Sequence, residues 1–364
     1  MKKIGVLFGQ ENTFPGALVD RINSMEIDGI TAEFVQVGGV EMAKPCPYAV
    51  IVDRISHDVP FYRSYLKNAA LTGTAVINNP FWWSADDKFF NYALAERLGV
   101  AVPRTVLLPH KFFPPMTNAQ SFRNLEFPLK WDEIFDYIKF PAFLKPHDGG
   151  GWRDVFHVHN PDEFFHAYDQ TRDLAMTLQA AVKFKEYFRC YVVGQEDVHI
   201  MPYDPSRPHA ERYVMDPPAY PKGLLERVKK DALTLCRALG YDLNTVEFAV
   251  EDGVPYAIDF MNPAPDADRV SVGEANFEWI VDQVSKLAVK KAKTAGKPMA
   301  ELRWSGFLGG EVKKAAVKKA ISKTASLGDR KPCECGCGGY PKTKTARFLP
   351  GHDLKKAYQN EAVG

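Results

Sequence analysis

The residues best suited to chemistry in this chain are two carboxylates within residues 247–262, which read EFAVEDGVPYAIDFMN. Apolar runs on both sides of the Glu-Asp-Gly tripeptide at 251–253 predict a β-hairpin. A two-residue Asp-Gly loop would put Glu247 and Asp259 on opposite faces, because side chains alternate along a strand. A three-residue loop, with Gly253 in the left-handed conformation, puts both on one face, and we expect this register.

The two faces of the predicted hairpin differ in character. The core face carries Val246, Phe248, Val250, Val254, Tyr256, Ile258 and Phe260. The other face carries Glu247, Ala249, Pro255, Ala257 and Asp259, with Asn262 just past the strand. Converging oxygen ligands on a rigid surface suit Mg²⁺, which keeps phosphate oxygens as its remaining ligands. Paired carboxylates on strands are common, so an ordinary hairpin with a solvated face is the alternative.

A second stretch is an apolar strand that ends at Lys145 and is followed by Gly149, Gly150 and Gly151. Consecutive glycines let backbone N–H groups approach an anion, and the lysine adds a point charge. A plain turn between two strands is the competing interpretation. Lys88 lies near the start of a helix predicted from Ser84 to Gly99, where a solvent-facing lysine is the alternative.

The elements that must position these residues follow from periodicity. Before residue 80 the patterns predict strands at Ile4–Phe8, Glu33–Val37, Tyr48–Val52 and Thr74–Ile77 and helices at Pro15–Met25 and Phe61–Leu71. This alternation predicts a parallel sheet with helices on both faces. No Gly-x-Gly-x-x-Gly follows Phe8, so a dinucleotide site has no support.

Later patterns predict a second set of elements. Strands are expected at Arg104–Leu108, Leu174–Val182, Glu186–Val193 (with Gly194 as a turn), Val198–Met201 and Arg212–Met215, and helices at Leu224–Leu239 and Phe277–Ala292. Residues 109–131 lack a period and are expected to form a long loop or insertion.

Composition places broad bounds on the chain. Its 364 residues exceed one compact core, and 46% hydrophobic and 25% charged residues are ordinary for a soluble globular protein. No apolar run approaches the roughly 20 residues needed to span a bilayer, so no membrane partner is expected. The N-terminus lacks a signal-peptide pattern, and we expect a cytoplasmic location.

The net charge of +1 hides a basic C-terminal region, since residues 286–323 contain eleven Lys or Arg against two Glu. The final segment holds three cysteines, Cys333, Cys335 and Cys337, followed by His352. A Zn²⁺ site is one alternative, although this spacing is tighter than usual. A docking element for a peptide or acidic partner, or a fused substrate, is the other. The lysines near 313–323 form a solvated helix or a nucleic-acid surface.

Five features occur in a fixed order: Lys88, Lys145 before its glycines, Gln179 with Glu186 in a connector, Glu247, and Asp259 with Asn262. This order resembles the ATP-grasp superfamily over about residues 75–292. It is most similar to the branch of glutathione synthetase and the enzymes that add glutamate to ribosomal proteins. The resemblance implies an α/β and α+β chain in which two sheets clasp a nucleotide, preceded by a small parallel-sheet domain and followed by the basic cysteine-containing tail.

The resemblance also implies roles for individual residues. Lys88 and Lys145 would contact phosphates beneath a mobile loop at Gly149, Gly150 and Gly151, and Glu186 would bind the ribose. Gln179, Ala180 and Val182 would hold adenine, and Arg189 and Lys145 would act in catalysis. Glu247, Asp259 and Asn262 would hold one or two Mg²⁺ ions, or Mn²⁺ in their place. Family members often carry an acid at the position of Gln179 and Glu at that of Asp259.

The implied domains are 1–105 (N-terminal α/β), 106–182 (central lid), 183–296 (C-terminal nucleotide subdomain) and 297–364 (tail). The implied activity is an ATP- and Mg²⁺-dependent, ADP-forming carboxylate–amine (or thiol) ligase that acts through an acyl-phosphate. Its substrates would be a small carboxylic acid and an amino acid or peptide. Two alternatives stay open: a nucleotide-binding regulator without turnover, and a nucleic-acid-associated protein that acts through its tail.

Overall fold

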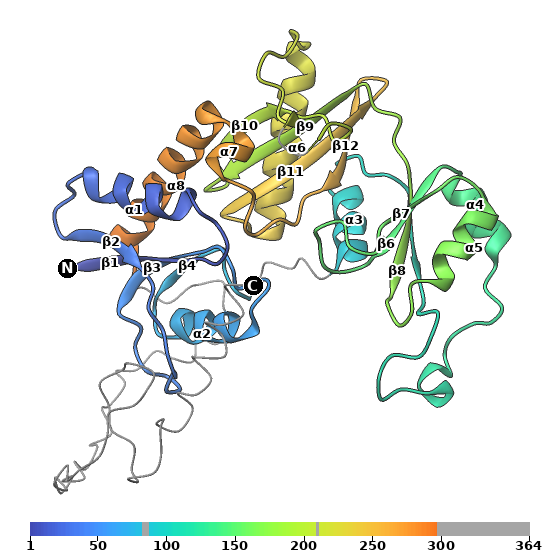
Figure 1. Ribbon diagram of the computed structural model, residues 1–364, viewed down its shortest axis with the longest axis horizontal. Coiled ribbons are helices and arrows are strands. Elements are labelled where there is room, and N and C mark those ends of the chain that lie inside the picture. The colour runs from blue at the N-terminus through green and yellow to red at the C-terminus, as the bar shows by residue number, and fades with distance from the viewer. Residues whose placement is uncertain (82–86, 209–210, 297–364) are drawn as a thin grey trace, which may run out of the picture. The chain divides into compact units, whose positions relative to one another are not determined.

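The computed structural model describes residues 1–81, 87–208 and 211–296 of the chain. Ser84, predicted to cap a helix, and the whole tail from 297 lie outside the described residues. Three four-stranded sheets make up the described part (Figure 1). None of its helices combines the length and apolar character that crossing a membrane requires.

The N-terminal sheet has the order β2-β1-β3-β4, and all its strand pairs are parallel, which confirms the predicted sheet. Its strands are β1 (Lys2–Leu7), β2 (Ile30–Phe34), β3 (Tyr48–Asp53) and β4 (Ala75–Ile77). The helices α1 (Phe14–Ser24) and α8 (Glu274–Thr294) pack together against one face, and α2 (Pro60–Leu71) covers the other. β2 begins three residues earlier than predicted, because Ile30 pairs with Lys2 at the start of β1.

The middle sheet is antiparallel with the order β5-β8-β6-β7. Its strands are β5 (Thr105–Leu108), β6 (Ala142–Pro146), β7 (Phe156–Val158) and β8 (Met176–Ala180). The helix α3 (Lys88–Arg97) precedes it, and the short 3-10 helix η1 (Ala119–Phe122) lies in the long insertion. Two further helices, α4 (Trp131–Ile138) and α5 (Pro161–Asp169), were not predicted, and they pack their aromatic side chains together on this sheet.

The C-terminal sheet is antiparallel with the order β10-β9-β11-β12. Its strands are β9 (Glu186–Val193), β10 (Asp197–Pro202), β11 (Leu243–Glu251) and β12 (Val254–Asp259). The helix α6 (Lys222–Leu239) packs on one face, and the short helix α7 (Arg269–Val272) precedes α8. The strand predicted at Arg212–Met215 is wrong: this segment makes one isolated bridge, between Tyr213 and Tyr203.

The hairpin of β11 and β12 differs from the prediction in the length of its loop and in its strand pairing. Glu251 pairs with Val254, so the loop has two residues, both with positive φ, and not three. A register shift then follows at Glu247, where a bulge on β12 restores the pairing of Glu247 with Asp259. The two carboxylates therefore share a face, as predicted, but by another route.

The shorter loop also exchanges the predicted faces of β12 up to the bulge. Ala257 is fully buried in the core beneath α6, beside Phe248, Val250 and Phe260. Ile258 lines the opposite, open face together with Asp259. The prediction that Ile258 lies in the core and Ala257 beside the carboxylates was wrong, because a loop one residue shorter than predicted moves the side chains of β12 up to Ile258 to the opposite faces.

Asn78, which follows β4, ties the N-terminal sheet to the C-terminal sheet. Its side-chain amide donates to the carbonyl oxygens of Leu243 (2.7 Å) and Pro263 (3.1 Å). Its Oδ1 accepts from the backbone N–H groups of Asp242 (2.7 Å) and Leu243 (2.8 Å). Because the side chain is buried, these four bonds fix where β11 begins.

Candidate nucleotide and metal site

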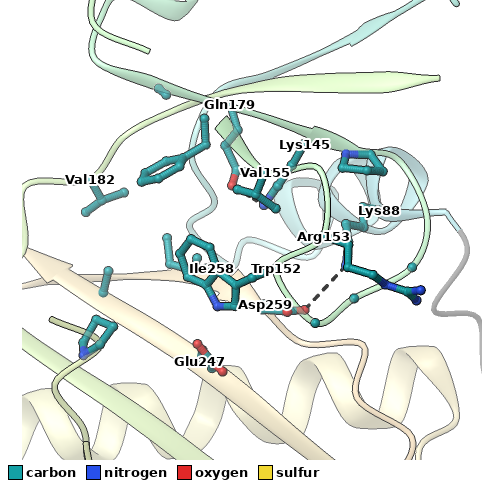
Figure 2. Close-up of a pocket in the computed structure, with 18 of the residues that line it drawn as sticks. Lys88, Lys145, Trp152, Arg153, Val155, Gln179, Val182, Glu247, Ile258 and Asp259 are labelled. Carbon is teal, nitrogen blue, oxygen red and sulfur yellow. Dashed lines mark hydrogen bonds and ion pairs between the residues drawn. The ribbon is translucent and has the colours of Figure 1, made fainter. Parts of the chain in front are cut away.

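A cavity of about 230 Å³ lies between the middle and C-terminal sheets (Figure 2). Ten of the predicted site residues line it: Lys88, Lys145, Gly149, Gly150, Gly151, Gln179, Ala180, Val182, Glu247 and Asp259. The sequence places these residues on separate elements up to 171 positions apart (259 − 88), and the fold brings them to one place.

Lys145 enters the cavity from β6 because strand alternation directs its neighbours Ala142 and Leu144 into the core of the middle sheet. Its Nζ donates to the Gln179 Oε1 on β8 (2.8 Å) and to the Tyr92 hydroxyl on α3 (2.8 Å). Burial lowers the pKa of Lys145 to about 8, and the carboxylates of Asp259 and Glu247 oppose that shift.

Lys88 is the first residue of α3, and the Asp87 side chain caps this helix by accepting from the Phe90 N–H (2.9 Å). The backbone N–H of Lys88 donates to the His147 carbonyl oxygen (2.7 Å), which joins α3 to the segment before the glycines. Only 8% of Lys88 is exposed, so the solvent-facing alternative does not hold. Its Nζ lies 4.0 Å from Asp259 Oδ1, as the dashed line in Figure 2 marks.

The glycine segment arches over the cavity with an unusual backbone. Gly149 and Gly151 have φ of 76° and 71°, and Trp152 and Asp154 also have positive φ. A Cβ added at any of the three glycines would meet no atom within 4 Å, so the segment stands clear of its surroundings. Positive φ is what requires glycine at 149 and 151, and the open space leaves room for a ligand beneath.

The apolar end of the cavity is formed by Phe143, Val182, Phe184, Ala249 and Ile258. At this end the backbone N–H groups of Ala180 and Ala181 are used within the protein, by the carbonyl oxygens of Arg104 (2.9 Å) and Pro141 (3.0 Å). An apolar slot beside a strand end suits a flat aromatic base.

The acidic end is built by Glu247 and Asp259, and the two differ in their surroundings. Glu247 Oε2 accepts from the Tyr187 hydroxyl (2.6 Å), and its Oε1 lies 3.3 Å from Arg189 Nε. Burial raises the pKa of Glu247, and the neighbouring Arg189 opposes that rise. Asp259 Oδ1 is buried and has no hydrogen-bond partner among the described residues. An unpartnered buried carboxylate oxygen facing a cavity fits a cation.

No cluster of three or more His, Cys, Asp or Glu that could hold a metal occurs among residues 1–81, 87–208 and 211–296. A metal at the acidic end would therefore depend on two carboxylates and on oxygens from a bound phosphate. Asn262, the third predicted ligand, does not line the cavity, and its backbone N–H donates to Asn244 Oδ1 (2.9 Å).

Two other predicted residues lie outside the lining. Arg189 sits on β9 directly opposite Glu247, and its guanidinium lies against the rings of Tyr203 (5.5 Å) and Tyr213 (6.0 Å). Glu186 lines a separate hollow that also includes Lys185 and Arg227. Their predicted roles, in catalysis and ribose binding, stay predictions.

Sequence reasoning missed Tyr92, Tyr187, Trp152 and Arg153, which all belong to the site. The spacing of the two tyrosines from predicted site residues could have indicated that they belong to the site. Tyr92 is four residues after Lys88 and so shares its helix face, and Tyr187 is two residues before Arg189 and so shares its strand face. Trp152 and Arg153 follow the glycines directly, but nothing in their spacing indicated that they would face the cavity.

The sequence of this chain was compared with protein-family models and with curated proteins. No protein-family model matches the chain. The D-alanine–D-alanine ligase of Chlorobaculum tepidum is 25% identical over 237 residues, which are 58% of this chain and 62% of that protein. This chain therefore matches only about three fifths of the length of that curated relative.

Solved structures extend the likeness to most of the chain. The D-alanine–D-alanine ligase of Bacillus anthracis, complexed with ATP, superposes with a TM-score of 0.55 at 17% identity, covering 81% of this chain and 99% of that one. A peptide-associated (RiPP) ATP-grasp ligase of Chryseobacterium gregarium, in complex with ADP and a leader and core peptide, gives 0.54 at 14% identity, covering 80% and 97%. The chain has the fold of the ATP-grasp superfamily.

This finding confirms the fold that the resemblance implies. Placement near glutathione synthetase and the ribosomal-protein glutamate ligases stays a prediction, as do the domain boundaries at 105, 182 and 296. The predictions for the tail, including Zn²⁺ and a docked partner, concern residues outside the described part.

Proposed function

We propose that this protein is an ATP-dependent ligase that joins a carboxylate to an amine (or thiol) of an amino acid or peptide. The observation that carries the proposal is the cavity itself. Lys88 and Lys145 enter it from α3 and β6, and Glu247 and Asp259 enter it from the opposite sheet. Cations and carboxylates facing each other across one cavity suit a metal-bound triphosphate.

The apolar end suits adenine, since Phe143, Val182 and Ile258 can sandwich a base. The phosphates would then extend toward Lys145 and Lys88, beneath the glycines. Each glycine contributes backbone N–H groups that approach an anion without side-chain hindrance. ATP as the ligand is supported by the matched structure from Bacillus anthracis, which was solved with ATP.

Glu247 and Asp259 would hold Mg²⁺, or Mn²⁺ in its place, in agreement with the buried Asp259 Oδ1, which has no hydrogen-bond partner among the described residues. The ion would supply charge neutralisation between the phosphate oxygens and the attacking group. The protein's own residues have separate tasks. Tyr187 and Arg189 orient Glu247, Lys145 and Lys88 attract the phosphates, and the glycine segment with Trp152 limits the access of water.

The proposed chemistry has two steps. A substrate carboxylate oxygen attacks the γ-phosphorus of ATP, so a new P–O bond forms as the bond to ADP breaks. The amine nitrogen then attacks the acyl carbon, a C–N bond forms, phosphate leaves, and the amine proton passes to solvent. Preorganised positive charge is the main contribution to such transfers.

The test is phosphate release by the full-length chain from ATP and Mg²⁺, screened against amino acids and short peptides, with the ligated product identified by mass. Release that depends on both an acid and an amine, with product heavier than either, supports the proposal. Tight ATP binding without release under any substrate pair would favour the regulator alternative. Failure to bind ATP or ADP at all would overturn the nucleotide site.

A further inference from the structure

The ammonium group of Lys145 has two neutral partners inside the protein. It donates to the amide oxygen of Gln179 and to the hydroxyl of Tyr92, each at 2.8 Å. A lysine has three N–H donors, so the contacts within the described residues leave one for a ligand. Neither partner carries a negative charge, so the positive charge of Lys145 is not cancelled by the groups that hold it.

Both partners are themselves fixed. The Gln179 side chain is buried, and its Nε2 donates to Thr105 Oγ1 (2.9 Å) on the adjacent strand β5. The Tyr92 hydroxyl donates to the Ile258 carbonyl oxygen (2.8 Å), which leaves its oxygen to accept from Lys145. The Gln179 carbonyl oxygen therefore cannot turn away from Lys145 without breaking the bond to Thr105.

We propose that Gln179 is a positioning residue, which holds Lys145 toward the nucleotide phosphates without neutralising it. This inference rests on the nucleotide site proposed above. A carboxylate of the same shape at position 179 would hold Lys145 equally well in space. It would also form an ion pair with the ammonium and compete with the phosphates for its charge.

Other charged groups surround Lys145 and set the background against which a change at 179 is measured. They are Glu247 on β11, Asp259 on β12, Lys88 on α3, His147 and Asp148 after β6, and Arg153 in the glycine segment. Burial lowers the pKa of Lys145 to about 8, despite Asp259 and Glu247. Nucleotide affinity should thus fall above pH 8, by up to about tenfold per pH unit as the ammonium loses its proton.

The experiment compares the full-length protein with Gln179→Glu and with the matched neutral variant Gln179→Leu. Dissociation constants for ADP and for adenosine are measured by calorimetry from about pH 6.5 to pH 10. Adenosine is the ligand control, because it lacks the phosphates that would sense Lys145. The ADP phosphates, with a last pKa near 6, stay ionised across the upper part of this range.

For Gln179→Glu we expect ADP to bind about tenfold more weakly at pH 7, because the new carboxylate offsets one charge in the cavity. The alkaline fall in affinity should move to higher pH, because the carboxylate helps Lys145 keep its proton. Gln179→Leu should also lower the affinity for ADP, because Lys145 is no longer held in position. It should not move the alkaline fall in affinity to higher pH. Adenosine affinity should change less than ADP affinity in both variants.

Two results would overturn the proposal. One is an alkaline fall that stays at the same pH in Gln179→Glu, and the other is an equal loss for ADP and adenosine, which would mean that Gln179 only supports the base end. These outcomes are separate from a failure of the proposed function, in which the unaltered protein itself would bind neither ADP nor ATP.

Discussion

Replacing Asp259 by Asn tests the acidic end of the cavity with the smallest change of shape. The substitution removes one negative charge from the carboxylate whose Oδ1 has no hydrogen-bond partner among the described residues. Asn keeps the side-chain length and one oxygen, so the pairing with Glu247 across the bulge need not change. Any effect on turnover would then report charge and metal binding, and not a rearranged hairpin.

Two opposing effects determine how much Asp259→Asn changes the unfolding free energy. Lys88 loses a carboxylate 4.0 Å away, while Glu247 loses a like charge that raises its pKa. The Asp259 side chain is 48% exposed, so water screens both effects. We expect a net change in unfolding free energy within about 1 kcal/mol. Removing one group that stabilises transferring charge should lower kcat by about 10²–10³-fold.

The assay is phosphate release at saturating ATP, titrated with Mg²⁺, beside urea unfolding of the same variant. Asp252→Asn is the matched control, because Asp252 lies on the turn of the same hairpin with φ of 50°, which Asn tolerates. This control should turn over normally. Full turnover by Asp259→Asn, or an equal loss in Asp252→Asn, would contradict the assignment of Asp259.

Three further variants test other parts of the structure. Asn78→Ala leaves buried backbone groups unpaired and should lower the unfolding free energy by about 3 kcal/mol in urea, whereas exposed Asn12→Ala should change it little. Gly151→Ala, at φ +71°, should lower the unfolding free energy by about 1 kcal/mol and also lower the affinity for ADP. Its control is Gly29→Ala, at the same φ but before β2, which should lower the unfolding free energy equally and leave the affinity for ADP unchanged. Glu247→Gln leaves a guanidinium that is 12% exposed without its carboxylate, so it should destabilise the fold by about 3 kcal/mol, and stability equal to that of the unaltered protein would contradict the pairing.

The N-terminal sheet could be predicted from sequence because short apolar runs and amphipathic helices are patterns of neighbouring residues. The central strand β3 is buried on both faces, so it appears as a short continuous apolar run, Val50–Val52. Alternation of such runs with amphipathic helices then leaves few topologies other than a parallel sheet. The boundaries were less accurate, most of all at β2, which lies three residues earlier than predicted because its limits depend on its pairing with β1 and not on its own residues.

The hairpin shows where local patterns stop being sufficient. The sequence around Asp252 is compatible with loops of two or three residues, and each predicts a different set of inward side chains. The structure uses the shorter loop and inserts a bulge at Ile258, a choice imposed by pairing and by the core beneath α6. The shorter loop exchanges Ala257 and Ile258, and the bulge, which has no signature in the residues that form it, then returns Asp259 to the face of Glu247.

The insertion between β5 and β6 illustrates a second limit. Residues 109–131 show no period, yet the last of them, Trp131, begins α4 and packs on Phe164 of α5. Both helices are short, and an aromatic cluster holds them in place. Short helices are marginal alone, so tertiary packing, which sequence periodicity does not report, is what stabilises them.

The two carboxylates of the site are not equivalent, and their difference follows from the strand on which each is found. β11 is a central strand, so β9 lies beside Glu247 and supplies Arg189 and Tyr187 as partners for both of its oxygens. β12 is the last strand of the sheet's order, so Asp259 has a strand on one side only; Lys88 of α3 lies 4.0 Å from its Oδ1, and that oxygen has no hydrogen bond among the described residues. An oriented carboxylate beside an open one is a suitable arrangement for a cation that must be held and still exchange ligands with a phosphate. The edge position of β12 is therefore part of the proposed function, because it leaves the Asp259 side chain 48% exposed beside the cavity.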